Sequence, residues 1–318
     1  MKRLQPIALL VGLSLLAAAC GNAPGQGGDG GDGADGGLSG SVAIDGSSTV
    51  GPLTDAIAEE YAAEQPDVTV NLSISGTGGG FERFCGVGDT DISNASRPIK
   101  QEEADLCAEN GIEFVEVRVG TDALTMVVNP RSDFVDCLTT EEVTRIFGPD
   151  APATSWNQVR DGLPDTPLQV FAPGTDSGTY DFMVEDVLGL GGSRQDYNAS
   201  EDDNIIVQGV AGTPGAWGFF GFAFFQQNQG QLKALAYDAG AGCVEPSVET
   251  AQDDTYEMAR PLFVYVKEQS LIEQEHVADF VRFYLDHVDE VIEDVGYIPV
   301  PEETIEDARQ KVEEATSG

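Results

Sequence analysis

The sequence predicts an α/β fold, in which strands alternate with helices along the chain. Short apolar runs with a period of two alternate with segments whose apolar residues recur every three or four positions. Hydrophobic residues make up 41% of the 318 residues and aromatic residues 8%. This composition is sufficient for a packed core and excludes a globally disordered chain.

The first predicted elements are a strand, a helix and a second strand. Residues 42–45 form the first strand, and Leu53, Ile57 and Tyr61 then recur at the four-residue spacing of a helix face. Residues 68–81 carry no charge, and apolar and polar residues alternate in the first part of this segment. We therefore expect a buried strand that leads into a shielded loop.

The later elements follow the same patterns. The uncharged segment 205–225 is long enough for a membrane span, but its many glycines favour a buried strand–turn–strand instead. The other predictions are a short strand and turn at 91–98, strands at 123–129, 168–172 and 262–266, and helices at 139–147, from the turn 173–179 to about 188, and at 277–295.

The N-terminus has the pattern of an export signal. Lys2 and Arg3 precede an apolar stretch at 7–19, which is too short for a stable transmembrane helix. Small residues then lead to Cys20, a pattern that resembles a bacterial lipobox, although an ordinary signal peptide with an incidental cysteine is the alternative. We expect a signal peptide at 1–19, lipidation of Cys20, and a flexible Gly/Asp-rich tether that extends to residue 40.

The charge and the cysteine content limit the class of protein to which this chain can belong. Asp and Glu number 55 and Lys and Arg 16, which gives a formal net charge of -39. A nucleic-acid binder needs a basic surface, so this class is excluded. Cysteines 85, 107, 137 and 243 predict two disulfides in an exported protein, with three pairings open at this point.

Small hydroxyl residues and glycine recur at three strand-to-helix turns. The turns contain residues 47–49, 75–77 and 177–179, and Ser96 and Arg97 mark a fourth. Helix N-termini carry unpaired N–H groups, glycine allows close approach of a ligand, and hydroxyl groups add donors. Each turn alone fits ordinary N-capping, but together they predict an anion-binding site.

The sequence resembles the substrate-binding lipoproteins of bacterial phosphate ABC transporters, which are members of the periplasmic-binding-protein-like family. The resemblance is closest to a subgroup with Ser-Arg-Pro in one turn. It rests on five stretches, which are Asp45-Gly-Ser-Ser-Thr-Val-Gly-Pro-Leu, Ser75-Gly-Thr-Gly-Gly-Gly-Phe81, Asp91-Ile-Ser-Asn-Ala-Ser-Arg-Pro-Ile99, Thr175-Asp-Ser-Gly-Thr-Tyr-Asp-Phe182 and Arg260-Pro-Leu-Phe-Val-Tyr-Val266.

The resemblance implies a two-lobed, type II periplasmic-binding-protein-like fold with two hinge crossings. Lobe 1 would contain residues 41–121 and 261–318, and lobe 2 would contain residues 122–260. Because lobe closure forbids disulfides between lobes, the implied pairing is Cys85–Cys107 and Cys137–Cys243. In the chain-entropy view, each bridge would stabilise the fold by about 3–5 kcal/mol.

The resemblance also implies which residues contact the ligand. Phosphate contacts fall on Ser48, Thr49, Ser75, Ser96, Ser177, Gly178 and Thr179. Two positions depart from the better-known pattern of the family. That pattern has Asp where this chain has Ser96, and Arg where this chain has Pro173. Arg97 becomes the candidate cationic ligand, with an ion-pair partner or surface residue as the alternative. Asp176 or Asp45 becomes the candidate acceptor of the ligand proton, although Asp176 could simply cap a helix.

The expected function is capture of inorganic phosphate in a cleft between the lobes and delivery to the permease subunits of an ABC importer. The implied protein is a monomer without cofactor or metal, anchored by lipid to the outer face of the cell membrane. Alternatives are a binder of molybdate, tungstate or sulfate, a signalling module, or a phosphate-ester hydrolase. His276 and His287, the two histidines, lie far from the three turns in sequence, so a serine nucleophile would lack a base. An enzyme is therefore not expected.

Overall fold

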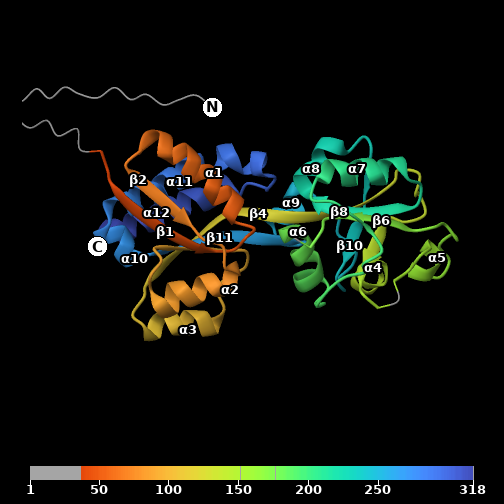
Figure 1. Ribbon diagram of the computed structural model, residues 1–318, viewed down its shortest axis with the longest axis horizontal. Helices are drawn as coiled ribbons and strands as arrows, with labels where there is room; N and C mark the ends of the chain where they lie inside the picture. Colours follow the sequence, from red (N-terminus) through yellow and green to blue (C-terminus); the bar gives the residue numbers. More distant parts are fainter. Residues whose placement is uncertain (1–36, 151, 176, 318) are drawn as a thin grey trace, which may run out of the picture. The chain divides into compact units, whose positions relative to one another are not determined.

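The fold was analysed in a computed structural model that describes residues 37–150, 152–175 and 177–317 (Figure 1). The expected signal peptide, Cys20, residues 21–36 of the expected tether and Asp176 lie outside the described residues. Residues from Gly37 onward form one compact unit. This unit is a mixed α/β fold with two lobes.

In the first lobe, the parallel strands β2, β1 and β3 lie beside the antiparallel pair β11 and β4. Helices α1, α10, α11 and α12 share the core on one face of this sheet, while α2, η1 and α3 pack on the other (Figure 1). The strands are β1 Gly40–Gly46, β2 Val68–Leu72, β3 Ile92–Ala95, β4 Phe114–Val128 and β11 Ala259–Lys267. The helices are α1 Gly51–Glu64, α2 Gly76–Phe81, the π-helix η1 Glu82–Val87, α3 Gln101–Glu109, α10 Glu268–Glu273, α11 Glu275–Val295 and α12 Glu302–Ser317.

In the second lobe, β4 pairs with β8, β8 pairs with β6, and β7 lies at the edge. Helices α7 and α8 pack on one face of this sheet, and α4, α5, α6 and η2 pack on the other. The strands are β5 Cys137–Thr139, β6 Gln169–Ala172, β7 Asn198–Ala199, β8 Ala216–Gly221, β9 Lys233–Ala234 and β10 Ala236–Asp238. The helices are α4 Thr140–Phe147, α5 Trp156–Val159, α6 Gly178–Asp181, the π-helix η2 Phe182–Val187, α7 Asp203–Gly212, α8 Phe222–Asn228 and α9 Val248–Gln252.

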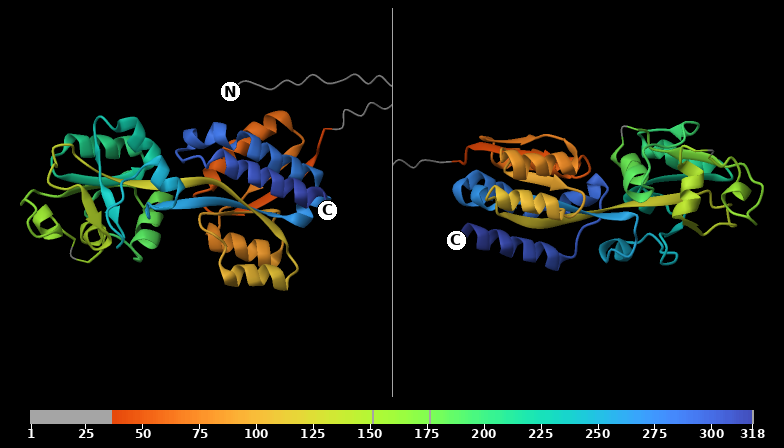
Figure 2. Two further views of the ribbon diagram at one scale, coloured as in Figure 1. Left: turned by 180° about the vertical axis from the view of Figure 1, so that it is seen from behind. Right: turned by 90° about the horizontal axis from the view of Figure 1, so that it is seen from below.

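Strands β4 and β11 run side by side and belong to both lobes (Figure 2). Along β4, Val119 packs in the core of the first lobe, whereas Leu124 packs in the core of the second. Near the start of β11, Leu262 belongs to the first core and Met258, just before the strand, to the second. The chain therefore passes between the lobes at these two places.

Most of the predicted elements are confirmed. The helix at 139–147 appears as α4, and Thr139 caps it by accepting a hydrogen bond from the Glu142 N–H. The helix at 277–295 appears as α11. The predicted strands at 42–45, 91–98, 168–172 and 262–266 correspond to β1, β3, β6 and β11, and 123–129 is the second half of β4.

Two predictions about the uncharged segments are wrong. Segment 205–225 is not a strand–turn–strand, because its first part belongs to helix α7, where Ile206, Val207 and Val210 bury one helical face. Strand β2 is not buried but lies at the edge of the sheet, and Ile74 just beyond it is 52% exposed. Alternate positions of β2 carry uncharged polar residues, which can face water although they bear no charge. The absence of charge therefore did not indicate burial.

Both disulfides have the pairing that the resemblance implies. Cys85 and Cys107 join η1 to α3, and Cys137 and Cys243 join β5 to the segment after β10. Each bridge lies within one lobe. In the described part of the chain, no helix is both long and apolar enough to cross a lipid bilayer.

Candidate anion-binding site

A cavity of about 410 Å³ lies where turns from both lobes meet the start of β11. Five residues predicted from the sequence line it, namely Ser48, Thr49, Ser96, Arg97 and Gly178. The other lining residues are Ser47, Gly76, Thr77, Asp181, Phe182, Glu185, Asp186, Ala259, Arg260 and Pro261. Ser75, Ser177 and Thr179 are not among the lining residues.

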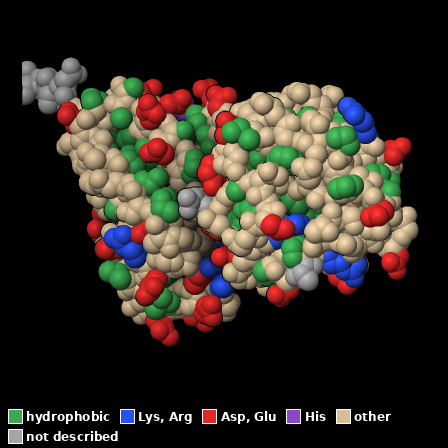
Figure 3. Space-filling model, turned by 45° about the vertical axis from the view of Figure 1, so that its right-hand side comes forward, with side chains coloured by type: hydrophobic (Ala, Val, Ile, Leu, Met, Phe, Trp, Pro, Cys, Tyr) green, Lys and Arg blue, Asp and Glu red, His purple; other side chains and the backbone are tan. Residues whose placement is uncertain are grey.

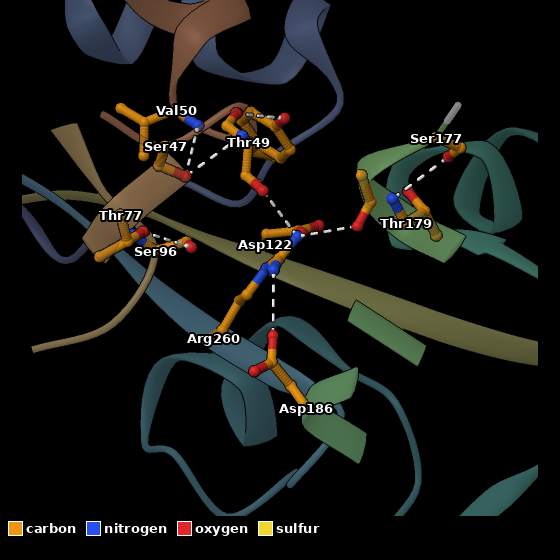
Figure 4. Close-up of polar contacts among 12 residues, drawn as sticks. Ser47, Thr49, Val50, Thr77, Ser96, Asp122, Ser177, Thr179, Asp186 and Arg260 are labelled. Carbon is orange, nitrogen blue, oxygen red and sulfur yellow. Dashed lines mark hydrogen bonds and ion pairs between the residues drawn. The ribbon is translucent and has the colours of Figure 1, made fainter. Parts of the chain in front are cut away.

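The turn between β1 and α1 is held by Ser47. The hydroxyl of this buried residue accepts hydrogen bonds from the backbone N–H groups of Thr49 and Val50 (Figure 4). This arrangement leaves the neighbouring Ser48 exposed in the cavity wall. The Thr49 carbonyl accepts a hydrogen bond from the Tyr297 hydroxyl, which ties the turn to the segment after α11. The turn therefore brings Ser48 and Thr49 to the cavity wall.

The second turn directs Ser75 away from the cavity. Its hydroxyl donates to Oδ1 of Asp45 at 2.8 Å, and Oδ2 of Asp45 forms an ion pair with Arg83 at 2.7 Å. Asp45 is 1% exposed and is not among the cavity-lining residues. With both oxygens engaged, Asp45 is poorly placed to accept a ligand proton. Instead it anchors the Ser75 turn to the end of β1.

Arg97 lines the cavity and is also an ion-pair partner. Its two terminal nitrogens donate to the two carboxylate oxygens of Glu103 at 2.8 and 2.7 Å. Burial disfavours the ionised carboxyl, but hydrogen bonds from Arg97 and from the Lys100 N–H outweigh burial and lower the pKa of Glu103. The Glu103 carboxylate in turn raises the pKa of Arg97. Beside Arg97, the Ser96 and Thr77 hydroxyl groups lie 3.2 Å apart, which joins the second and fourth turns.

At the third turn, Gly178 lines the cavity while Ser177 caps helix α6. The Ser177 hydroxyl accepts a hydrogen bond from the Thr179 N–H at 3.2 Å (Figure 4). Capping was the alternative interpretation of this serine, and its hydroxyl has this role in the structure. The Gly178 carbonyl accepts a hydrogen bond from Arg260. This contact links the third turn to β11.

Arg260 lines the cavity and contacts several other residues there, although it was not among the contacts predicted from the resemblance. Its Nε donates to Asp122 at 3.0 Å, and its Nη2 donates to the Thr49 hydroxyl at 2.7 Å and to the Gly178 carbonyl at 3.3 Å. Its guanidinium also lies 4.1 Å from the centre of the Phe182 ring. Arg260 is 9% exposed. The sequence did hold a signal for this residue. Basic residues are few in this chain, and Arg260 lies where the chain passes between the lobes for the second time.

Three carboxylates also line the cavity, at Asp181, Glu185 and Asp186. They lie on the helical segment after the third turn and not in the turn itself. After Gly178 the chain is helical, so side chains three, seven and eight positions later return to the same wall. Burial raises the pKa of Asp181, and Asp186 adds to this effect while Arg260 opposes it.

No cluster of three His, Cys, Asp or Glu side chains suited to a metal ion occurs within residues 37–150, 152–175 and 177–317. The cavity instead combines hydroxyl groups and guanidinium donors with a carboxylate-bearing wall. Donors of this kind suit a ligand rich in negatively charged oxygens. The arrangement therefore fits an oxyanion better than a cation.

Comparisons with known sequences identify relatives along most of the chain. Residues 31–287 match the PBP superfamily domain. Protein SphX of Synechococcus elongatus is 47% identical over 281 residues, which are 87% of this chain and 82% of SphX. The phosphate-binding protein PstS of Staphylococcus saprophyticus is 38% identical over 305 residues, which are 96% of this chain and 92% of PstS.

Solved structures agree with these sequence matches. A possible phosphate binding protein from Planctomyces limnophilus is 41% identical and covers 87% of this chain and 99% of its own, with a TM-score of 0.84. An ABC-type phosphate transport receptor from Vibrio cholerae is 22% identical with a TM-score of 0.65, covers 81% of this chain and 99% of its own, and supports the fold alone. The chain thus belongs to the PBP superfamily and, within it, to the family of SphX and PstS.

Proposed function

We propose that this chain is an extracytoplasmic solute-binding protein that captures inorganic phosphate and delivers it to an ABC importer. The observation that carries the proposal is the cavity in which Arg97, Arg260 and several hydroxyl groups converge from both lobes. The relatives named as phosphate-binding proteins match nearly the full chain and support this ligand. The protein acts by binding and release, not by catalysis.

The proposed contacts use neutral and charged donors together. Phosphate oxygens would accept hydrogen bonds from Ser48, Thr49, Ser96 and the guanidinium groups of Arg97 and Arg260. Hydrogen bonds between a guanidinium and an anionic oxygen are about twice as strong as neutral ones. Gly178 leaves room for close approach of the anion. Ser75, Asp176, Ser177 and Thr179 remain contacts predicted from the resemblance alone.

The proposed lobes are residues 41–121 with 261–318, and residues 122–260. This division is supported by the change of core along β4 and β11. Arg260 lies at the crossing and contacts Thr49 of one lobe and Gly178 of the other. A ligand held by this guanidinium would favour the closed arrangement of the lobes.

We also propose that the protein is exported and held at the outer face of the cell membrane through lipid on Cys20. This part of the proposal rests on the basic, apolar and small-residue segments before Cys20. The protein would act as a monomer that docks on the membrane permease of the importer. An outer-face location places the cavity where the solute enters.

Calorimetric titration with phosphate, arsenate, sulfate, molybdate and tungstate from pH 6 to pH 8.5 tests the proposal. We expect one phosphate per chain and weaker binding of sulfate, which carries no proton to donate at these pH values. Tight binding of molybdate, tungstate or sulfate without phosphate binding would overturn the phosphate assignment. Turnover of a chromogenic phosphate ester would instead support a hydrolase.

A further inference from the structure

One edge of the Arg260 guanidinium faces a carboxylate of the protein itself. Nε and Nη2 of Arg260 are engaged by Asp122, Thr49 and Gly178. Nη1 lies 3.5 Å from Oδ2 of Asp186, which approaches from the side opposite Thr49 (Figure 4). The part of Arg260 that remains for a ligand is therefore shared with Asp186.

Asp186 is placed to compete for this edge. Its side chain is 64% exposed and lines the cavity on η2, so a small rotation would move the carboxylate away from Arg260. Its charge also acts on its surroundings. The Glu103 hydrogen bond has the largest effect on the pKa of Arg97, and Asp186 adds to this rise while burial opposes it. Burial has the largest effect on the pKa of Asp181, and Asp186 adds to that rise. The carboxylate therefore interacts electrostatically with both arginines of the cavity.

We propose that Asp186 is an internal counter-ion of Arg260, which the incoming oxyanion must displace. A carboxylate presents two acceptor oxygens, as does one edge of a tetrahedral oxyanion, so the two compete for the same N–H groups. The inference rests on the proposed function, because it assumes that an oxyanion binds in this cavity. Its consequence is that Asp186 lowers the affinity for the ligand and assists release when the lobes open.

The chain provides a matched control for this role. Glu185 precedes Asp186 on η2, lines the same cavity and carries the same charge. Among the described residues, Glu185 forms no ion pair with an arginine or lysine. Glu185→Gln therefore removes a charge from the same wall without removing a partner of Arg260. Asp186→Asn keeps the shape of the side chain and removes the counter-ion.

Calorimetry with inorganic phosphate at fixed ionic strength and pH 8 compares the unaltered protein with these two variants. An exposed ion pair is worth up to about 1 kcal/mol, so we expect Asp186→Asn to lower the Kd about fivefold. Glu185→Gln removes a negative charge from the same wall but no partner of Arg260, so it should lower the Kd by less than about twofold. Weaker or unchanged binding by Asp186→Asn would overturn the inference, as would an equal gain from Glu185→Gln.

A second measurement on the ligand-free protein separates this inference from the proposed function. In NMR spectra of the arginine guanidinium groups, the Arg260 Nη resonances should shift in Asp186→Asn and stay in place in Glu185→Gln. Identical Arg260 resonances in all three proteins would overturn the pairing even where phosphate binds. Failure of the unaltered protein to bind phosphate would overturn the proposed function, and the spectra would still decide whether Asp186 pairs with Arg260.

Discussion

The side chain of Arg260 makes several contacts at once, each with a different partner. It is buried, it forms an ion pair with buried Asp122, and its planar guanidinium reaches Thr49 and Gly178 from different parts of the fold. Lysine has the same charge but lacks the fixed fork of donors that these contacts use. Shape as well as charge therefore determines the role of this residue.

We expect Arg260→Lys to weaken phosphate binding at least tenfold. The substitution removes directional hydrogen bonds to charged or polar partners, each worth about 1.5–3 kcal/mol when one partner is ionised. Calorimetry measures the affinity, and thermal unfolding shows whether the variant remains folded.

Arg160→Lys is the matched control for Arg260→Lys. Arg160 also pairs with a carboxylate, Glu142, but does not line the cavity. Its replacement should leave the phosphate affinity unchanged. Equal affinities of Arg260→Lys and the unaltered protein would remove Arg260 from the binding site.

At the scale of elements, local sequence signals succeed where a cap or a regular period defines the structure. Helix α4 has the Thr139–Glu142 capping pair, and α11 has a continuous apolar face. The turns that supply Ser48, Ser96 and Gly178 to the cavity also follow from such signals. Contacts of Arg260 join residues far apart in the chain, so no local pattern specifies them.

Absence of charge proved a weaker signal than periodicity. Segment 205–225 is uncharged, yet it forms most of α7, all of β8 and the start of α8, and it contributes no residue to the cavity lining. Its Ile206, Val207 and Val210 follow helical spacing, which predicts α7 once the period is counted. The helix-forming stretch Phe182–Val187 similarly explains why Glu185 and Asp186 reach the cavity.

The first turn of α7 predicts a pH dependence of stability. Burial, with Asp202 and Glu201 nearby, raises the pKa of Asp203 to about 6. In the unfolded chain the value is about 3.9, so between these pH values the folded state binds more protons than the unfolded state. The contribution of Asp203 to the free energy of unfolding should therefore decrease as pH rises from about 4 to about 6.

Asp203→Asn should remove this slope and raise the free energy of unfolding at pH 7 by about 1–2 kcal/mol. Urea unfolding at a series of pH values measures both effects. Glu249→Gln, at an exposed position in the first turn of α9, should keep the pH profile of the unaltered protein. A profile for Asp203→Asn that matches the unaltered protein would contradict the assignment.

At the scale of the whole molecule, charge and ligand have the same sign. The formal net charge is -39, and acidic side chains are spread over the face shown in Figure 3, where basic ones are few. Charges on the surface are screened over about 8 Å at physiological salt, so they repel an anion in the cavity only weakly. We expect Arg97 and Arg260 to act on the anion at contact distance, and ion pairs with Glu103 and Asp122 hold them in place.

We expect phosphate binding to be coupled to closure of the lobes, because Arg260 lies close to the place where the two lobes are connected. β4 and β11 connect the lobes, and the pairing register of β11 shifts between Leu262 and Phe263, next to the crossing. A shift of register locally weakens the ladder and makes bending easier there. Because Arg260 lies two residues before this shift, a ligand on its guanidinium acts directly at the proposed hinge.

We expect saturating phosphate to lower the radius of gyration measured by small-angle X-ray scattering. Arg260→Met, which removes the guanidinium that contacts both lobes, should not become more compact at the same phosphate concentration. Sulfate at equal ionic strength controls for a general salt effect. If calorimetry shows phosphate bound while the scattering of the unaltered protein stays the same, the ligand does not distinguish open from closed lobes, and β4 and β11 would then serve as a rigid connection.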